Sequence, residues 1–100
     1  ASLGGLVAGV AHEINTPVGI AVSSASFLSD RTEAARALLR AGRFDTAAQE
    51  KYLDEARESA RLLLSNARRV AQLVLNFKQL AVDRITEARL AFDLRAHLED

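Results

Sequence analysis

The fold is decided by residues 3–42, LGGLVAGVAHEINTPVGIAVSSASFLSDRTEAARALLRAG. Apolar residues recur in this stretch at alternating steps of four and three, which is the period of one face of an α-helix. The positions on this face are Leu3, Val7, Val10, Ile14, Pro17, Ala21, Ser24, Leu28, Arg31, Ala35 and Leu38. Glycine commonly follows the last residue of a helix. We therefore expect one long helix that ends at Ala41–Gly42.

A second helical pattern follows a short connector at residues 43–45. Thr46 and Gln49 have the spacing of a capping box, in which the two side chains satisfy opposite backbone donors. The four-three period then continues at Leu53, Ala56, Ala60, Leu63, Ala67, Val70, Val74, Phe77 and Ala81. Two long helices joined by a short loop form an antiparallel hairpin.

Further apolar residues make both helical stripes wider than one hairpin can cover. They are Leu6, Val18, Val22, Ala25, Leu62, Leu64, Leu73 and Leu80. Two hairpins packed as a four-helix bundle would bury both stripes. We therefore predict an all-α homodimer. The alternative is a monomer whose apolar surface is covered by another domain.

The composition restricts the classes of partner and site. The chain has 13 Lys and Arg against 13 Asp and Glu, so its charge favours neither nucleic acid nor an anionic membrane. It has no cysteine, which excludes disulfides and thiolate chemistry and fits a reducing compartment. Its apolar runs are far shorter than the ~20 residues of a membrane span. The first residues lack the basic region of a signal peptide, and helical periodicity is already present there. We expect a segment of a longer protein.

Residues 12–17, HEINTP, stand out within the first helix. A proline inside a helix costs about 3 kcal/mol, because it removes a donor and clashes with the carbonyl four residues back. That carbonyl belongs to Glu13. Val10 and Ile14 lie on the core stripe, so at 100° per residue His12 faces solvent, with Thr16 one turn further on the same face. The sequence therefore predicts a reachable imidazole next to a carboxylate.

A lone surface histidine beside a glutamate is usually just a solvated pair, and His97 is interpreted in that way. A helical zinc site would need a second histidine where the chain has Thr16, so zinc is disfavoured. Arg68, Arg69 and Lys78 lie on the second helix near the level of His12. We predict that they dock an acidic partner or a phosphoryl group, the alternative being a solvated basic face.

Residues 3–17, LGGLVAGVAHEINTP, closely resemble the H-box of bacterial sensor histidine kinases, in the subgroup whose box reads HEINTP. Residues 66–79, NARRVAQLVLNFKQ, are similar to the second dimerisation helix of that subgroup, and Phe92-Asp93-Leu94 resembles the start of its ATP-binding domain. The resemblance covers nearly the whole chain. It identifies the chain as a dimerisation and histidine-phosphotransfer (HisKA-type) domain.

The resemblance implies a role for each residue of the box. His12 would be the phosphoacceptor for the γ-phosphoryl group of ATP, and Glu13 would accept the imidazole proton and orient the ring. Asn15 would contact the catalytic domain or the nucleotide. Thr16 would position water for dephosphorylation of a response regulator. Pro17 would be the hinge that lets the helix move when a signal arrives.

It also implies the partners and the domain organisation. Residues 1–83 would be the dimerisation and phosphotransfer hairpin, and residues 84–100 a linker and the truncated start of the ATP-binding domain. ATP and Mg²⁺ would be used by that domain, with no cofactor or metal bound here. This part of the kinase would not phosphorylate itself. The phosphoryl group would pass to an aspartate on a receiver domain in the cytoplasm, whether or not the parent protein is anchored in the inner membrane.

The end of the chain differs in pattern from the helices before it. Residues 88–92, ARLAF, are typical of a short strand, and Asp93 is a good N-cap for a following helix. We expect a strand and the first turns of a helix there.

Two other functions are compatible with the residues. The chain could be a non-catalytic dimeric helical scaffold, in which the His–Glu pair is incidental and Pro17 is only a kink. It could also be an ATP-independent phosphorelay intermediate, which keeps the phosphorylated histidine but uses no nucleotide. The exposed polar residues at positions 12, 13 and 16 favour a phosphotransfer role over a scaffold.

Overall fold

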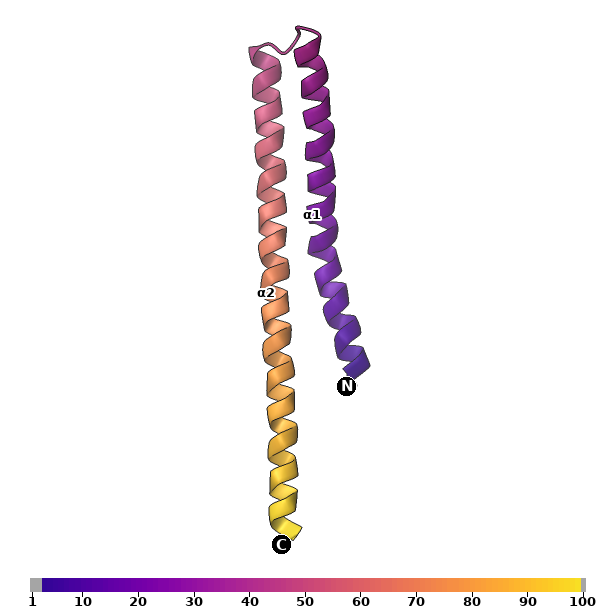
Figure 1. Cartoon of the computed structure of the whole chain (residues 1–100), viewed down its shortest axis with the longest axis vertical. Helices are drawn as coiled ribbons and strands as arrows, with labels where there is room; N and C mark the ends of the chain where they lie inside the picture. Colours follow the sequence, from indigo (N-terminus) through magenta and orange to yellow (C-terminus); the bar gives the residue numbers. More distant parts are fainter. Residues whose placement is uncertain (1–2, 100) are drawn as a thin grey trace.

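The computed structural model describes residues 3–99, which form two helices, α1 (Leu3–Arg40) and α2 (Thr46–Glu99). The helices run antiparallel and side by side as a hairpin (Figure 1). The molecule is a rod of 85 × 18 × 15 Å. The prediction of an all-α helical hairpin is confirmed. Residues 1, 2 and 100, at the ends of the predicted domain ranges, lie outside the described residues.

The loop begins with a glycine-terminated helix end, as the sequence predicts. Gly42 adopts a left-handed φ of 70°, which L-residues with a side chain rarely adopt. The N–H of Gly42 donates to the carbonyl of Leu39 at 3.1 Å, and the N–H of Arg43 donates to the carbonyl of Leu38 at 2.8 Å. This pair of bonds is a Schellman motif, which satisfies carbonyls that the end of α1 leaves without helical donors.

The cap of α2 differs from the predicted capping box. Asp45, not Thr46, is the N-cap: its Oδ1 accepts a hydrogen bond from the N–H of Ala48 at 2.8 Å, and its carbonyl accepts one from the N–H of Gln49 at 2.9 Å. The side chain of Gln49 donates to the carbonyl of Phe44 at 2.9 Å. A carboxylate at this position also interacts favourably with the positive end of the helix dipole. The helix therefore starts one residue earlier than the capping-box spacing suggests.

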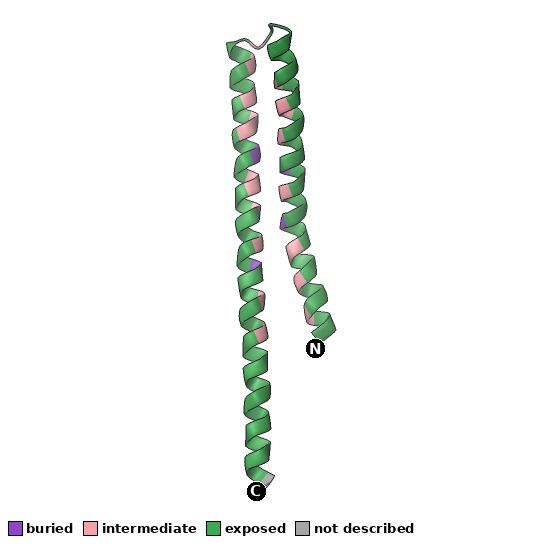
Figure 2. Cartoon of the chain, viewed as in Figure 1, coloured by how far each residue is buried: buried purple, intermediate pink, exposed green. Residues whose placement is uncertain are grey.

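The face of α1 that contacts α2 follows the predicted stripe. Its buried and half-buried positions form one line along the helix, facing α2 (Figure 2). They are Leu6, Val10, Ile14, Pro17, Ala21, Ser24, Leu28, Arg31, Thr32 and Ala35. The prediction is confirmed from Val10 to Ala35. It is wrong at the two ends, because Leu3, Val7 and Leu38 are exposed.

The face of α2 that contacts α1 lies to one side of the predicted stripe. The covered positions are Ala48, Tyr52, Glu55, Ala56, Ser59, Leu62, Leu63, Asn66, Val70, Leu73, Phe77 and Ala81. By contrast Leu53, Ala60, Ala67 and Val74, which belong to the predicted stripe, are exposed. The apolar pattern of α2 thus spans two faces, of which only one contacts α1.

The contact between the helices combines apolar and polar side chains. Ser24 and Ser59 are buried, as are the apolar residues Pro17 and Leu73. Nearer the loop, the hydroxyls of Thr32 and Tyr52 are hydrogen-bonded at 2.8 Å. Hydrophobic stabilisation scales with the apolar area removed from water, so the leucine, valine, isoleucine and phenylalanine side chains of this contact supply most of it and the serines supply little.

The hairpin also exposes more surface than a compact protein of its size. A globular monomer of 10.8 kDa exposes about 5,500 Å², whereas this chain exposes 7911 Å². Large apolar side chains contribute to the excess. In residues 3–99, neither helix has an apolar stretch of the length and hydropathy needed to cross a bilayer. A single hairpin thus leaves much of its apolar surface uncovered.

Pro17 lies inside α1 and is buried against α2. Because proline has no N–H, the carbonyl of Glu13 loses the donor that a regular helix would supply. The N-terminal part of α1 leans away from α2 (Figure 1), which fits a helix weakened at a proline. Movement at Pro17 in response to a signal stays a prediction.

The strand expected at residues 88–92 is wrong, because α2 continues without a break through Glu99. The new helix expected at Asp93 is likewise absent, since Asp93 lies inside α2. A strand needs a neighbouring strand to pair its backbone groups, whereas a helix pairs them internally, and residues 3–99 contain no strand. Phe92 and Leu98 are 71% and 78% exposed on this part of α2. The domain boundary after residue 83 stays a prediction.

The assignment of Asp45 as the cap gives a test of the loop. We expect Asp45→Ala to lower the free energy of unfolding by about 1 kcal/mol, because the N–H of Ala48 would lose its side-chain acceptor and the start of α2 would lose a favourable charge. Urea denaturation at one fixed protein concentration measures this change. Thr46→Ala is the matched control and should change stability by only a few tenths of a kcal/mol. A larger effect at Thr46 than at Asp45 would restore the capping box as the dominant cap.

Candidate functional site

His12 lies on α1 with its side chain exposed, as the helical phase predicts. The neighbouring stripe residues Val10 and Ile14 are half-buried against α2, so the intervening position points away from that contact. Within residues 3–99, the imidazole has no hydrogen-bond or ion-pair partner. Both ring nitrogens are therefore open to a reacting group.

A shallow hollow of about 340 Å³ brings His12 together with residues of α2. It is lined by His12, Glu13, Thr16, Pro17 and Ile20 of α1 and by Asn66 and Arg69 of α2. Among the basic residues singled out in the sequence, Arg69 lies in this hollow, while Arg68 and Lys78 do not line it. The antiparallel pairing of the helices thus places one cation beside the histidine.

The two oxygen-bearing side chains beside His12 are arranged differently. The Thr16 hydroxyl donates to the backbone carbonyl of His12 at 3.4 Å, so it is held one turn along the same face. The carboxylate of Glu13 lines the hollow but makes no hydrogen bond to the imidazole in this structure. Adjacent residues on a helix point 100° apart, so this contact needs a change of side-chain rotamer.

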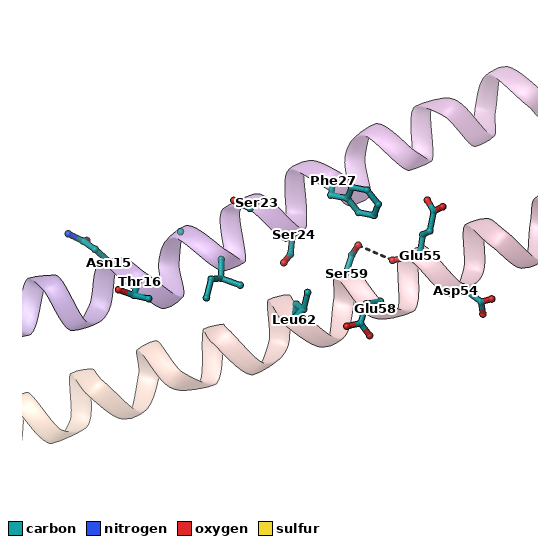
Figure 3. Close-up of a pocket in the computed structure, with 12 residues that line it drawn as sticks. Asn15, Thr16, Ser23, Ser24, Phe27, Asp54, Glu55, Glu58, Ser59 and Leu62 are labelled. Atoms are coloured by element: carbon teal, nitrogen blue, oxygen red, sulfur yellow. Dashed lines mark hydrogen bonds between the residues drawn. The ribbon is translucent and has the colours of Figure 1, made fainter.

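A longer groove, which the sequence reasoning missed, runs from Thr16 toward the loop end of the hairpin. It has a volume of about 920 Å³ and contains Asn15, which is not in the His12 hollow (Figure 3). Its lining residues are Asn15, Thr16, Gly19, Ile20, Ser23, Ser24, Phe27, Asp54, Glu55, Glu58, Ser59 and Leu62. Thr16 and Ile20 line both the groove and the hollow, so the two are continuous.

A sequence signal for this groove exists in the spacing of α1. Ile20 and Phe27 are seven residues apart and therefore share one face, with the small residues Gly19 and Ser23 beside them. Across the helix contact, Ser24 and Ser59 face each other (Figure 3), and the Ser59 hydroxyl donates to the carbonyl of Glu55 at 2.8 Å. Small side chains at these positions leave the space that larger residues would fill.

Two of the three acidic side chains that line the groove lie near cations, while Asp54 has no ion-pair partner within residues 3–99. Glu58 forms a hydrogen-bonded ion pair with Arg61 at 2.6 Å, and this hydrogen bond lowers the pKa of the Glu58 carboxyl. The carboxylate of Glu55 lies 3.7 Å from Arg31 and 4.0 Å from Lys51. The groove is therefore apolar with a rim of mostly paired charges rather than a strongly acidic cleft.

The other side of the hairpin is apolar. We call it the apolar flank and define it by exposed residues that helical phase places on the side away from the groove. Val22 and Leu53 are 59% and 63% exposed there. Its residues are Val18, Val22, Ala25 and Leu39 of α1 and Leu53, Ala60, Leu64, Ala67 and Val74 of α2. The hairpin thus has a polar flank that carries His12 and an apolar flank that carries little chemistry.

No metal site accompanies the histidine in the described part of the chain, where no three His, Asp or Glu side chains converge. The chemistry available is that of an exposed imidazole, a neighbouring carboxylate, a hydroxyl and a guanidinium. An imidazole nitrogen is a nucleophile, and a carboxylate can accept its proton. This group of side chains suits transfer of a small electrophilic group onto His12.

Comparison with protein-family models gives a match to the His Kinase A (phospho-acceptor) domain over residues 2–82. Comparison with curated proteins and with solved structures gives no match. The matched range contains α1, the loop and most of α2, including the whole His12 hollow and the groove. The chain belongs to the His Kinase A phosphoacceptor domain family.

Proposed function

We propose that this domain takes a phosphoryl group from ATP onto His12 and passes it to an aspartate of a response regulator. His Kinase A domains provide the phosphoacceptor and dimerisation functions of histidine kinases. The observation that carries the assignment to His12 is its exposed, unpartnered imidazole in a hollow built from both helices. His97 has no such surroundings, since α2 stands alone at that level.

The chemistry of the first step follows from the side chains at the site. A ring nitrogen of His12 attacks the γ-phosphorus of ATP, and the bond from that phosphorus to the bridging oxygen breaks as ADP leaves. The proton on the other ring nitrogen passes to the Glu13 carboxylate. Such transfers depend mainly on positioning and on charge stabilisation. ATP and Mg²⁺ would be supplied by a separate ATP-binding domain, and Asn15 would contact that domain or its nucleotide.

The groove beside the hollow supports a docking position for the response regulator. The groove and the His12 hollow share Thr16 and Ile20. A protein bound in the groove would therefore lie next to the phosphohistidine. The exposed ring of Phe27 offers an apolar anchor there. Thr16 would then orient a water toward the regulator's phosphoaspartate during dephosphorylation. These partners place the domain in the cytoplasm.

The apolar flank supports a four-helix bundle of two hairpins. A second copy packed on this flank would bury Val22, Leu53 and their neighbours and leave the polar flank with His12 open. Both copies would then present their histidines outward. Pro17 would allow the N-terminal part of α1 to bend relative to this bundle.

We expect His12→Gln to abolish labelling of the domain when a histidine-kinase ATP-binding domain and ATP labelled in its γ-phosphoryl group are added. Acid-labile, base-stable label on the protein, followed by peptide mapping, measures the modification. His97→Gln, the other histidine in the chain, is the control and should be labelled like the natural protein. Equal labelling of the His12 variant would disprove the assignment of the phosphoacceptor.

We expect Thr16→Ala to slow dephosphorylation of the regulator at least about tenfold, because the water loses its positioning hydroxyl. Phosphotransfer from His12 to the regulator should change less than twofold. Both rates are measured with the same phosphorylated regulator and kinase. Thr16→Ser keeps the hydroxyl and should retain dephosphorylation. A parallel loss of both activities in Thr16→Ala would show that Thr16 has only a structural role.

We expect Ala67→Glu to weaken dimerisation at least about tenfold, because it places a carboxylate in an apolar interface in both copies. Ser65→Glu is the matched control: it is two residues away, exposed, and on the opposite flank of α2. Sedimentation equilibrium over a range of concentrations measures both variants. A stronger effect at Ser65 would place the dimer interface on the polar flank.

A further inference from the structure

Arg69 has no ion-pair partner within residues 3–99, unlike two arginines near the groove. Arg31 lies against Glu55, and Arg61 against Glu58. Arg69 lines the His12 hollow from α2, yet within residues 3–99 its guanidinium has no ion-pair or hydrogen-bond partner. Glu13 lines the same hollow but does not pair with it. The guanidinium is therefore free to bind an anion that arrives in the hollow.

Phosphorylation of His12 would bring that anion. A phosphoryl group adds about two negative charges and three acceptor oxygens, and here it would sit in the hollow that Glu13 also lines. Two anionic groups in one hollow repel each other, so a cation beside them would stabilise the phosphorylated state. Arg69 is the cation that the fold supplies in this hollow.

The chemistry of arginine and the size of the hollow fit this role. A guanidinium presents a planar fork of N–H donors that binds two phosphoryl oxygens at once. The hollow has a volume of about 340 Å³, whereas a phosphoryl group occupies the space of only a few waters of about 30 Å³ each. Asn66 lies one turn before Arg69, and its Nδ2 donates a hydrogen bond to the carbonyl of Leu62 at 2.8 Å. This bond fixes the Asn66 side chain in the hollow.

We propose that Arg69 of α2 binds the phosphoryl group on His12 of α1 and so stabilises the phosphorylated state across the helix contact. The proposal rests on the proposed function, because it takes His12 as the phosphoacceptor. The proposal assigns this role to Arg69 and not to Arg68 or Lys78, because those two residues do not line the hollow. In this proposal Arg69 contacts the transferred group directly, by charge and by hydrogen bonding.

The test uses phosphoramidate, a chemical donor that needs no ATP-binding domain. A ring nitrogen of His12 attacks the phosphorus, the donor's N–P bond breaks, and ammonia leaves with a proton. The protein carries His97→Gln so that His12 is its one histidine. Arg69→Gln removes the guanidinium, Arg69→Lys keeps the charge without the fork, and Arg68→Gln is the matched control on the adjacent position.

We expect Arg69→Gln to slow labelling of His12 about tenfold, with Arg69→Lys between it and the natural residue and Arg68→Gln within about twofold. A ³¹P NMR titration of the phosphohistidine should show a higher phosphoryl pKa in Arg69→Gln, because a bound cation favours the dianion. Circular dichroism and sedimentation confirm that the variants keep their helix content and oligomeric state.

Two outcomes overturn the proposal and are distinguishable. If His12→Gln abolishes labelling but Arg69→Gln matches Arg68→Gln in rate and in phosphoryl pKa, Arg69 does not bind the phosphoryl group, while His12 remains the phosphoacceptor. If His12→Gln is labelled like the natural protein, the proposed function itself fails. Equal slowing by the Arg68 and Arg69 variants would show a diffuse charge effect and would also overturn the specific role of Arg69.

Discussion

A two-helix hairpin can cover only one stripe of each helix, and the rest of this molecule depends on that constraint. The covered stripe here contains small and polar groups, including the buried Ser24 and Ser59, so the helices approach each other without using most of their apolar residues. Many of those residues lie on the apolar flank, where a second hairpin could cover them, whereas Ile20 and Phe27 line the groove on the other flank. The other flank stays open, and it carries His12. The packing of the two helices thus leaves the proposed dimer surface on the apolar flank and the proposed reactive surface, with His12, on the other flank.

Pro17 connects the helix contact to the site. Pro17 is buried on the side of α1 that contacts α2. It directly follows Thr16 and lies five residues after His12 in the same helix. The His12 hollow is made from both helices, because Asn66 and Arg69 come from α2. Any change in the angle at Pro17 therefore changes the distance between His12 and the α2 side of the hollow. A bend at Pro17 would in this way alter the proposed reaction at His12 without moving the proposed dimer interface.

Periodicity was sufficient to predict the hairpin, the stripe of α1 from Val10 to Ala35, the outward direction of His12 and the glycine end at Gly42. Periodicity was insufficient on α2, where apolar residues occupy both the face toward α1 and the apolar flank. The predicted stripe of α2 therefore contains residues of both faces, and only some of them contact α1. The choice of Asp45 over Thr46 depends on competing local hydrogen bonds. The groove and the position of Arg69 depend on the register between helices, and the helical state of residues 84–99 on the lack of a strand partner.

The charges of the polar flank differ along its length, and this difference matches two separate tasks. Around the groove, Glu55 and Glu58 are paired with cations of the same chain. Exposed pairs of this kind contribute little to stability, but they leave Asp54 as the one unpaired carboxylate of the groove within residues 3–99. Recognition by the proposed partner would then rest largely on shape and on apolar contact with Ile20 and Phe27. At the His12 end, Arg69 has no ion-pair partner within residues 3–99. Its positive charge is therefore available to a phosphoryl group on His12. Under the proposed function, a response regulator would bind in the groove largely by shape, while Arg69 would respond by charge to the phosphorylation of His12.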